Sequence, residues 1–103
     1  MTGPKKIGFW SDLKAKNIGK QRGFLYNGHK YRVIKDFIDY DGTTHIKGEV
    51  WTFLAYSFNY YDNGLQWFIT FDGAEEWSIP LFLDDMEQQD IDSHPEVYIE
   101  VYN

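Results

Sequence analysis

Apolar and polar residues alternate in short runs along the chain after residue 23, and this alternation is typical of half-buried β-strands. In the first long run, Tyr31, Val33 and Phe37 fall on one side. The remaining runs of this kind are rich in aromatic and β-branched residues and cover residues 49–58, 66–71, 75–83 and 96–102. The pattern therefore predicts a mainly β protein.

Asn-Gly or Asp-Gly pairs separate several of these runs, and such pairs favour tight hairpin turns because their backbones accept positive φ angles. They stand at residues 27–28, 41–42, 63–64 and 72–73. Five or six short strands joined in this way predict a small antiparallel barrel, closed or nearly closed. The acidic stretch 84–94 predicts a short helix or a turn.

Residues 1–22 differ from the rest because they are basic, polar and interrupted by glycine. The stretch FWSDLKAKNIGK favours a short helix with Ser11 as its N-cap and Gly19 just past its end, or else a loosely held arm. We therefore divide the chain into a basic N-terminal arm or short helix, residues 1–22, and a single β-barrel domain, residues 23–103. The first residues lack the apolar core of a secretory signal, so we expect a cytoplasmic protein.

Composition adds two facts to this picture. The chain of 103 residues has 19% aromatic residues and no cysteine, which indicates one domain with a core of bulky rings and no disulfides. Its net charge of −6 is unevenly spread, since residues 1–35 contain nine Lys/Arg and one acid, whereas residues 36–103 contain one lysine and fifteen acids. This asymmetry indicates a basic arm, an acidic partner-binding face, or internal neutralisation.

The acids around the Asp41-Gly42 turn allow a metal site or a solvated turn. Read as a calcium loop, the stretch has Phe37 at position 1 and Gly48 at position 12, where ligands are required. A single histidine, His45, with Asp39 and Asp41 gives a weak metal-site pattern, although it leaves a small metal-dependent hydrolase as an alternative. We expect these acids to cap turns, and we predict no metal, no cofactor and no catalytic residues.

The aromatic residues point to binding. A domain of this size buries about half of its rings, and exposed Tyr and Trp are typical of protein interfaces. Nucleic acid is a less suitable partner because the rings lie in the acidic part of the chain. We therefore predict a protein partner with a basic surface, of unknown stoichiometry, contacted by aromatic and acidic residues: Tyr40, Trp51, Tyr56, Tyr60, Tyr61, Trp67, Asp39, Asp41 and Glu49.

Residues 31–81 resemble a family of small bacterial domains of unknown function. The resemblance rests on a Y-x-V, K-x-F, D-Y-D-G, G-E-x-W-x-F-L pattern followed by Asp-Gly and Trp positions, here Tyr31, Val33, Lys35, Phe37, 39–42, Gly48, Glu49, Trp51, Phe53, Leu54, Tyr61, Asp62, Gly64, Leu65, Asp72, Gly73 and Trp77. The family has no assigned activity, so the resemblance implies no catalytic residues.

A weaker resemblance links KDFIDYDG and KGEVWTFL to the first strand, acidic loop and second strand of SH3-type barrels, which bind peptides. The paired tryptophans of those domains are absent, so their peptide specificity does not transfer. The sequence thus predicts a small SH3-like barrel that binds a protein, with an inhibitor of the immunity-protein kind as the preferred version. A peptide-binding regulatory accessory domain is the other alternative to the hydrolase.

Overall fold

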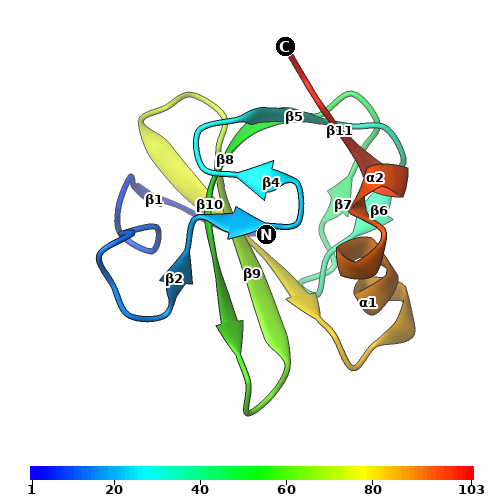
Figure 1. The fold of residues 1–103 in the computed structure, drawn as a ribbon. Coiled ribbons are helices and arrows are strands. Elements are labelled where there is room, and N and C mark those ends of the chain that lie inside the picture. Colours follow the sequence, from blue (N-terminus) through cyan, green and yellow to red (C-terminus); the bar gives the residue numbers. More distant parts are fainter.

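A computed structural model describes residues 1–103 and shows one antiparallel sheet flanked by two small ribbons and two helices (Figure 1). The strand order in the sheet is β1 (Thr2–Lys6), β10 (Glu75–Phe82), β9 (Gly64–Thr70), β8 (Val50–Asn59), β5 (Lys30–Val33) and β11 (Ile99–Val101), and β2 (Ile18–Gly19) also pairs with β8. The ribbons are β3 (Gln21–Arg22) with β4 (Leu25–Tyr26), and β6 (Phe37–Ile38) with β7 (Thr44–His45). The helices are α1 (Met86–Ser93) and α2 (Pro95–Tyr98).

The mainly β, antiparallel part of the prediction is confirmed, but the strand pairing does not close into a barrel. No pairing joins β1 to β11, the two ends of the sheet. The two ribbons and α1 instead each contribute a side chain to the hydrophobic core, namely Leu25, Phe37 and Ile91. Bulky residues from these added elements complete the core without a closing strand pair.

No helix forms between residues 11 and 19, and both helices of the fold, α1 and α2, lie near the other end of the chain. Residues 2–6 and 18–19 are strands, and turns connect them. The backbone N–H groups of Trp10 and Ser11 donate to Oε1 of the buried Glu76 at 2.9 and 3.4 Å, and the Trp10 ring stacks on Phe68. These contacts fix the start of the segment on the sheet, and the pairing of β2 with β8 fixes its end.

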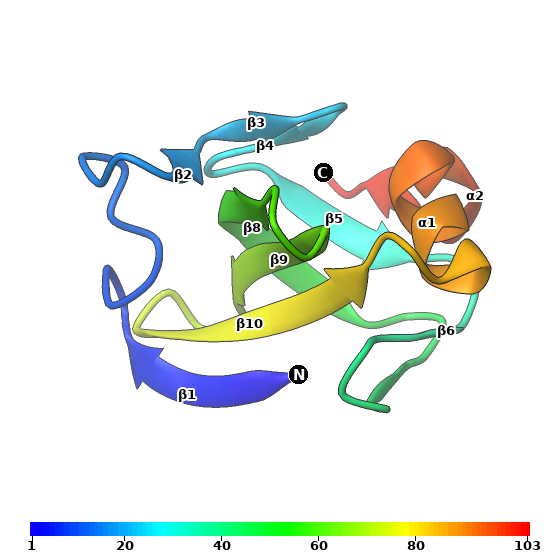
Figure 2. The same ribbon diagram turned by 90° about the horizontal axis from the view of Figure 1, so that it is seen from below.

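The core is built from large aromatic residues on the central strands. Trp51, Trp67, Tyr31 and Phe53 are among its largest fully buried side chains. The hydroxyl of Tyr31 donates to the Phe24 carbonyl at 2.6 Å, so the polar group of this buried ring is satisfied. No helix is long and apolar enough to cross a membrane. Figure 2 shows α1 and α2 beside β6 at one end of the molecule and the turns of residues 7–17 at the other end.

Candidate functional site

The structure divides the predicted partner-binding residues into an interior group and a surface group. Trp51, Trp67 and Asp39 are buried, with 1%, 0% and 2% of their surface exposed, and Glu49 is half-buried. Fully buried side chains do not contact a partner, so Trp51, Trp67 and Asp39 shape the domain from within.

Asp39 and Glu49 form a buried network with His45, which is itself fully buried. Nε2 of His45 lies 2.8 Å from Oδ2 of Asp39, and Nδ1 lies 2.8 Å from Oε2 of Glu49. Glu49 Oε2 also accepts the indole N–H of Trp51 at 3.1 Å, and Asp39 Oδ2 lies 2.7 Å from the amino group of Met1. The imidazole ring packs on Phe37, with the ring centroids 4.7 Å apart.

This environment shifts two pKa values in opposite directions. Burial on its own lowers the pKa of His45, but the hydrogen bonds to Asp39 and Glu49 outweigh burial and raise that pKa above its ordinary value of 6.5. Burial raises the pKa of Asp39, whereas its hydrogen bonds to His45, the Met1 amino group and the Thr43 N–H outweigh burial and lower it below 3.8. The network thus favours a charged pair inside the domain.

The same geometry leaves little room for the metal-dependent alternative. Both imidazole nitrogens are already engaged with carboxylates, so neither offers a free lone pair to a cation. Asp41 lies outside the pair and accepts the hydroxyl of Thr2 at 2.9 Å. No group of three His, Asp or Glu side chains has an arrangement suited to a metal ion.

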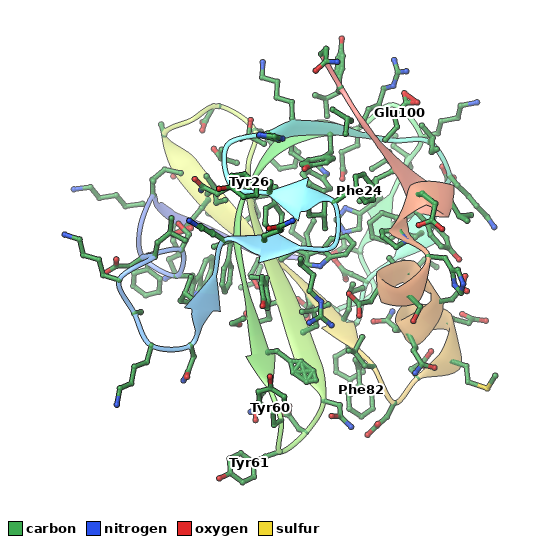
Figure 3. The ribbon with its side chains drawn as sticks, in the orientation of Figure 1. Phe24, Tyr26, Tyr60, Tyr61, Phe82 and Glu100 are labelled. Atoms are coloured by element: carbon green, nitrogen blue, oxygen red, sulfur yellow. The ribbon has the colours of Figure 1, made fainter.

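Among the surface residues, Tyr60 and Tyr61 lie at the tip of the β8–β9 hairpin, with 86% and 102% of their surface exposed. Figure 3 shows both residues at the far end of this hairpin, with Tyr61 outermost. Together with Tyr56 they line a groove of about 710 Å³ beside β2. Gly19 of β2 lies so close to the Tyr56 ring that a Cβ atom would be 2.3 Å from it. Tyr56 is therefore held under β2, whereas Tyr60 packs edge-on against Phe58, with ring centroids 4.7 Å apart, and Tyr61 is fully exposed.

Tyr40 belongs to a second surface, which we call the acidic strip. Its ring contacts that of Phe82, with centroids 5.2 Å apart, and its N–H donates to the Pro80 carbonyl at 2.8 Å. Exposed Ile38 and Met86 lie further along the strip. The strip follows the border between β6, the end of β10 and the start of α1, and comprises Ile38, Tyr40, Asp41, Phe82, Asp84, Asp85, Met86 and Glu87.

A hollow of about 670 Å³ lies within this border, between β6 and α1. Ile38 and Met86 line it and have 56% and 84% of their surface exposed. The charged side chains around it are one lysine and four acids: Lys35, Asp36, Asp85, Glu87 and Asp90. The hollow therefore combines exposed apolar side chains with a strongly negative rim.

Most basic side chains lie elsewhere and are not neutralised by ion pairs. Among the lysines and arginines, only Arg22 and Arg32 form such pairs, with Asp92 at 2.8 Å and with Glu100. Lys14 and Lys16 belong to the turns of residues 7–17, at the end of the molecule opposite α1 (Figure 2). The lysines of these turns therefore lie away from the acidic strip.

Sequence reasoning missed the apolar members of the strip, namely Ile38, Phe82 and Met86. A signal was present for one of them, because Met86 stands alone among acids in DDMEQQD, where an exposed methionine is unusual. Ile38 and Phe82 follow the strand pattern and look like core residues until their neighbours are known. Asn63 Nδ2 donates to Asp84 Oδ1 at 2.8 Å, a contact that brings the hairpin tip next to the strip.

Comparison with known proteins supports the resemblance seen in the sequence. The structure is similar to integron cassette protein VCH_CASS4 from the mobile metagenome of Vibrio cholerae, with a TM-score of 0.77, 29% identity, and coverage of 82% of this chain and 93% of that chain. No curated protein matches. The family model "Domain of unknown function (DUF3601)" matches residues 12–103, well beyond the stretch that carried the resemblance. The chain therefore belongs to the DUF3601 family of domains of unknown function.

Proposed function

We propose that this domain is a non-enzymatic protein-binding module that covers a basic surface of its partner with the acidic strip. The observation that carries the proposal is the hollow between β6 and α1, where exposed Ile38 and Met86 are surrounded by four carboxylates and one lysine. Apolar contact excludes water at the centre of an interface, and charges at its rim speed association with an oppositely charged protein.

Two further features support a protein partner over a small molecule. The strip is continuous with the exposed hairpin tip through the Asn63–Asp84 contact, so it offers a surface larger than the hollow alone. Its aromatic members, Tyr40 and Phe82, pack on each other, which holds both rings in place. A rigid aromatic side chain loses little entropy when a partner covers it.

We favour an inhibitor of the immunity-protein kind as the finer version of this function. Such a protein neutralises a toxin or enzyme by covering its surface and needs no catalytic residue of its own. Small size, acidity and a preformed acidic-apolar surface suit this role when the target is basic. Toxin activity measured with and without the domain would test this version directly.

A paired capture experiment tests the binding function. The domain is immobilised and exposed to a lysate of its source organism at low salt, beside an Asp85→Asn/Glu87→Gln variant that lacks two strip charges. A matched control, Asp12→Asn/Glu75→Gln, loses the same charge away from the strip. We expect basic proteins to be retained by the wild type and the control and lost by the strip variant. Identical protein sets on all three baits would contradict the proposal.

A further inference from the structure

The hollow between β6 and α1 already holds one cation, and it belongs to the domain itself. Nζ of Lys35 lies 5.1 Å from the centroid of the Tyr98 ring. The hydroxyl of Tyr98 donates to Oδ2 of Asp90 at 2.6 Å, and all three side chains line the hollow. An aromatic face next to a carboxylate is a favourable position for an ammonium or guanidinium group.

Nothing else in the fold holds the Lys35 ammonium in place. The residue is exposed, and its amino group takes part in no ion pair. Its backbone N–H donates to the Tyr98 carbonyl at 3.3 Å, which fixes the main chain and leaves the side chain free to swing away. A surface contact between a cation and a ring is weak and easily exchanged for another.

Asp90 and Tyr98, in contrast, are fixed by their mutual hydrogen bond. This bond to Tyr98, together with His94 and Lys35, lowers the pKa of Asp90, so its carboxylate stays charged over a wide pH range. The position against Tyr98 is therefore preformed, while its present occupant is an exposed side chain held only by a weak surface contact.

We propose that a Lys or Arg side chain of the protein partner occupies the position against Tyr98 and Asp90 that Lys35 takes in the free domain. The inference rests on the proposed function and specifies how its partner is recognised. The long methylene stem of such a side chain packs along Ile38 and Met86, and its charged head meets the ring and the carboxylate. Lys35 then acts as an internal competitor, displaced when the partner binds.

If Lys35 competes with the partner's side chain, then removing Lys35 from the binding surface should strengthen binding rather than weaken it. Lys35→Met removes the competitor and should tighten binding of a basic partner. The substitution also makes the domain more negative, which by itself strengthens attraction to any basic protein. Lys20→Met produces the same change in net charge at the exposed start of the β3–β4 ribbon and controls for that general attraction.

The probe is a fluorescent 18-residue amphipathic helical peptide with lysines on one face and leucines on the other, titrated by anisotropy in low salt. We expect Lys35→Met to bind it about threefold to tenfold more tightly than Lys20→Met does. Tyr98→Leu, which removes the ring, should bind about fivefold more weakly than the wild type. Tyr98→Phe keeps the ring, so its affinity for the peptide should lie between those of Tyr98→Leu and the wild type. Circular dichroism confirms that each variant is folded.

The outcomes separate the two proposals. Equal affinities of Lys35→Met and Lys20→Met, with binding still weakened by Asp85→Asn/Glu87→Gln, would overturn the competition inference alone. Peptide affinity unaffected by Asp85→Asn/Glu87→Gln, Lys35→Met and the Tyr98 variants would overturn the binding function together with the competition inference. A peptide whose lysines are acetylated should not bind, since the recognised group is then absent.

Discussion

Nε2 of His45 lies 2.8 Å from Oδ2 of Asp39, and neither side chain is exposed to solvent. Asp39 stands between Ile38 and Tyr40, the first two residues of the acidic strip. Its contact with His45 joins the start of the β6–β7 turn to strand β7, and Oδ1 accepts the N–H groups of Asp41 and Thr43 at 3.0 Å. The buried pair thereby fixes the turn that presents Ile38 and Tyr40.

His45→Ala should destabilise the domain strongly. The substitution takes a hydrogen-bond partner from both Asp39 and Glu49, and breaking a buried ion pair by removing one member costs about 3 to 5 kcal/mol. Urea unfolding measures the change. His94→Ala is the matched control, because the His94 side chain is exposed and the change should stay below about 1 kcal/mol. Similar losses in the two variants would show that the buried pair does not stabilise the fold.

Stability should also depend on pH through this network. His45 has a raised pKa, so its contribution is complete below about pH 6.5 and is lost as the pH rises through the higher folded value. Asp39 has a lowered pKa, so its contribution is present above pH 3.8 and is lost as the pH falls through the lower folded value. These two groups together favour maximal stability between pH 3.8 and 6.5.

The measurement is the free energy of unfolding between pH 4 and 9 for the wild type and His45→Gln, which lacks the titrating imidazole. We expect the advantage of the wild type to shrink as the pH rises above 6.5. Parallel curves for the two proteins over this range would contradict a raised His45 pKa.

Gly19→Ala should weaken the pairing of β2 with β8. The new Cβ atom would be 2.3 Å from Cε1 of Tyr56, so the ring or the strand must move. Overpacking of this kind costs about 1 to 3 kcal/mol. In a Tyr56→Leu background the clash is relieved and the cost should largely disappear, which a double-mutant cycle in urea would measure.

Asp85 has two separable roles, as an N-cap and as a charge of the strip. Its Oδ1 accepts the N–H groups of Glu87 and Gln88 at 3.0 and 3.2 Å at the start of α1. Asp85→Ala should therefore cost about 1 kcal/mol of stability, whereas Asp85→Asn keeps an acceptor and should cost little. Both variants should bind a basic partner less tightly. Thermal unfolding beside peptide titration distinguishes the two effects.

Sequence reasoning identified the strands because alternation and Asn-Gly or Asp-Gly turns are local signals. The hairpin predicted near Asn63-Gly64 forms, but its turn spans residues 60–63 and Gly64 already pairs with Asn59 as the first residue of β9. The N-terminal helix was predicted from equally local signals, but residues 18–19 pair with β8 instead, and Glu76, more than sixty residues away, holds the N–H groups of Trp10 and Ser11. Local helix propensity decides the structure of a segment only where no contact with a distant residue competes with it.

The candidate site also shows that local sequence signals do not determine which residues are buried. Trp51 and Tyr60 are both large aromatic residues near strand ends, yet one is buried and the other almost fully exposed. Composition predicted that some rings would remain outside, but not which ones, because burial depends on what packs across the sheet. Likewise Asp39 and Asp41 share a turn, and only their neighbours in space separate a buried ion-pair partner from a surface acid.

The amino-acid sequence by itself determined that the chain forms antiparallel β-structure, that it has no thiol chemistry, and that its charge divides between its two parts. These properties follow from residue type, alternation and turn chemistry, which act over a few positions. Only the tertiary structure decided that the sheet stays open, that His45 lies between two carboxylates, and that Ile38 and Met86 meet across an acidic hollow. Each of these depends on contacts between distant segments, whose packing no local pattern specifies.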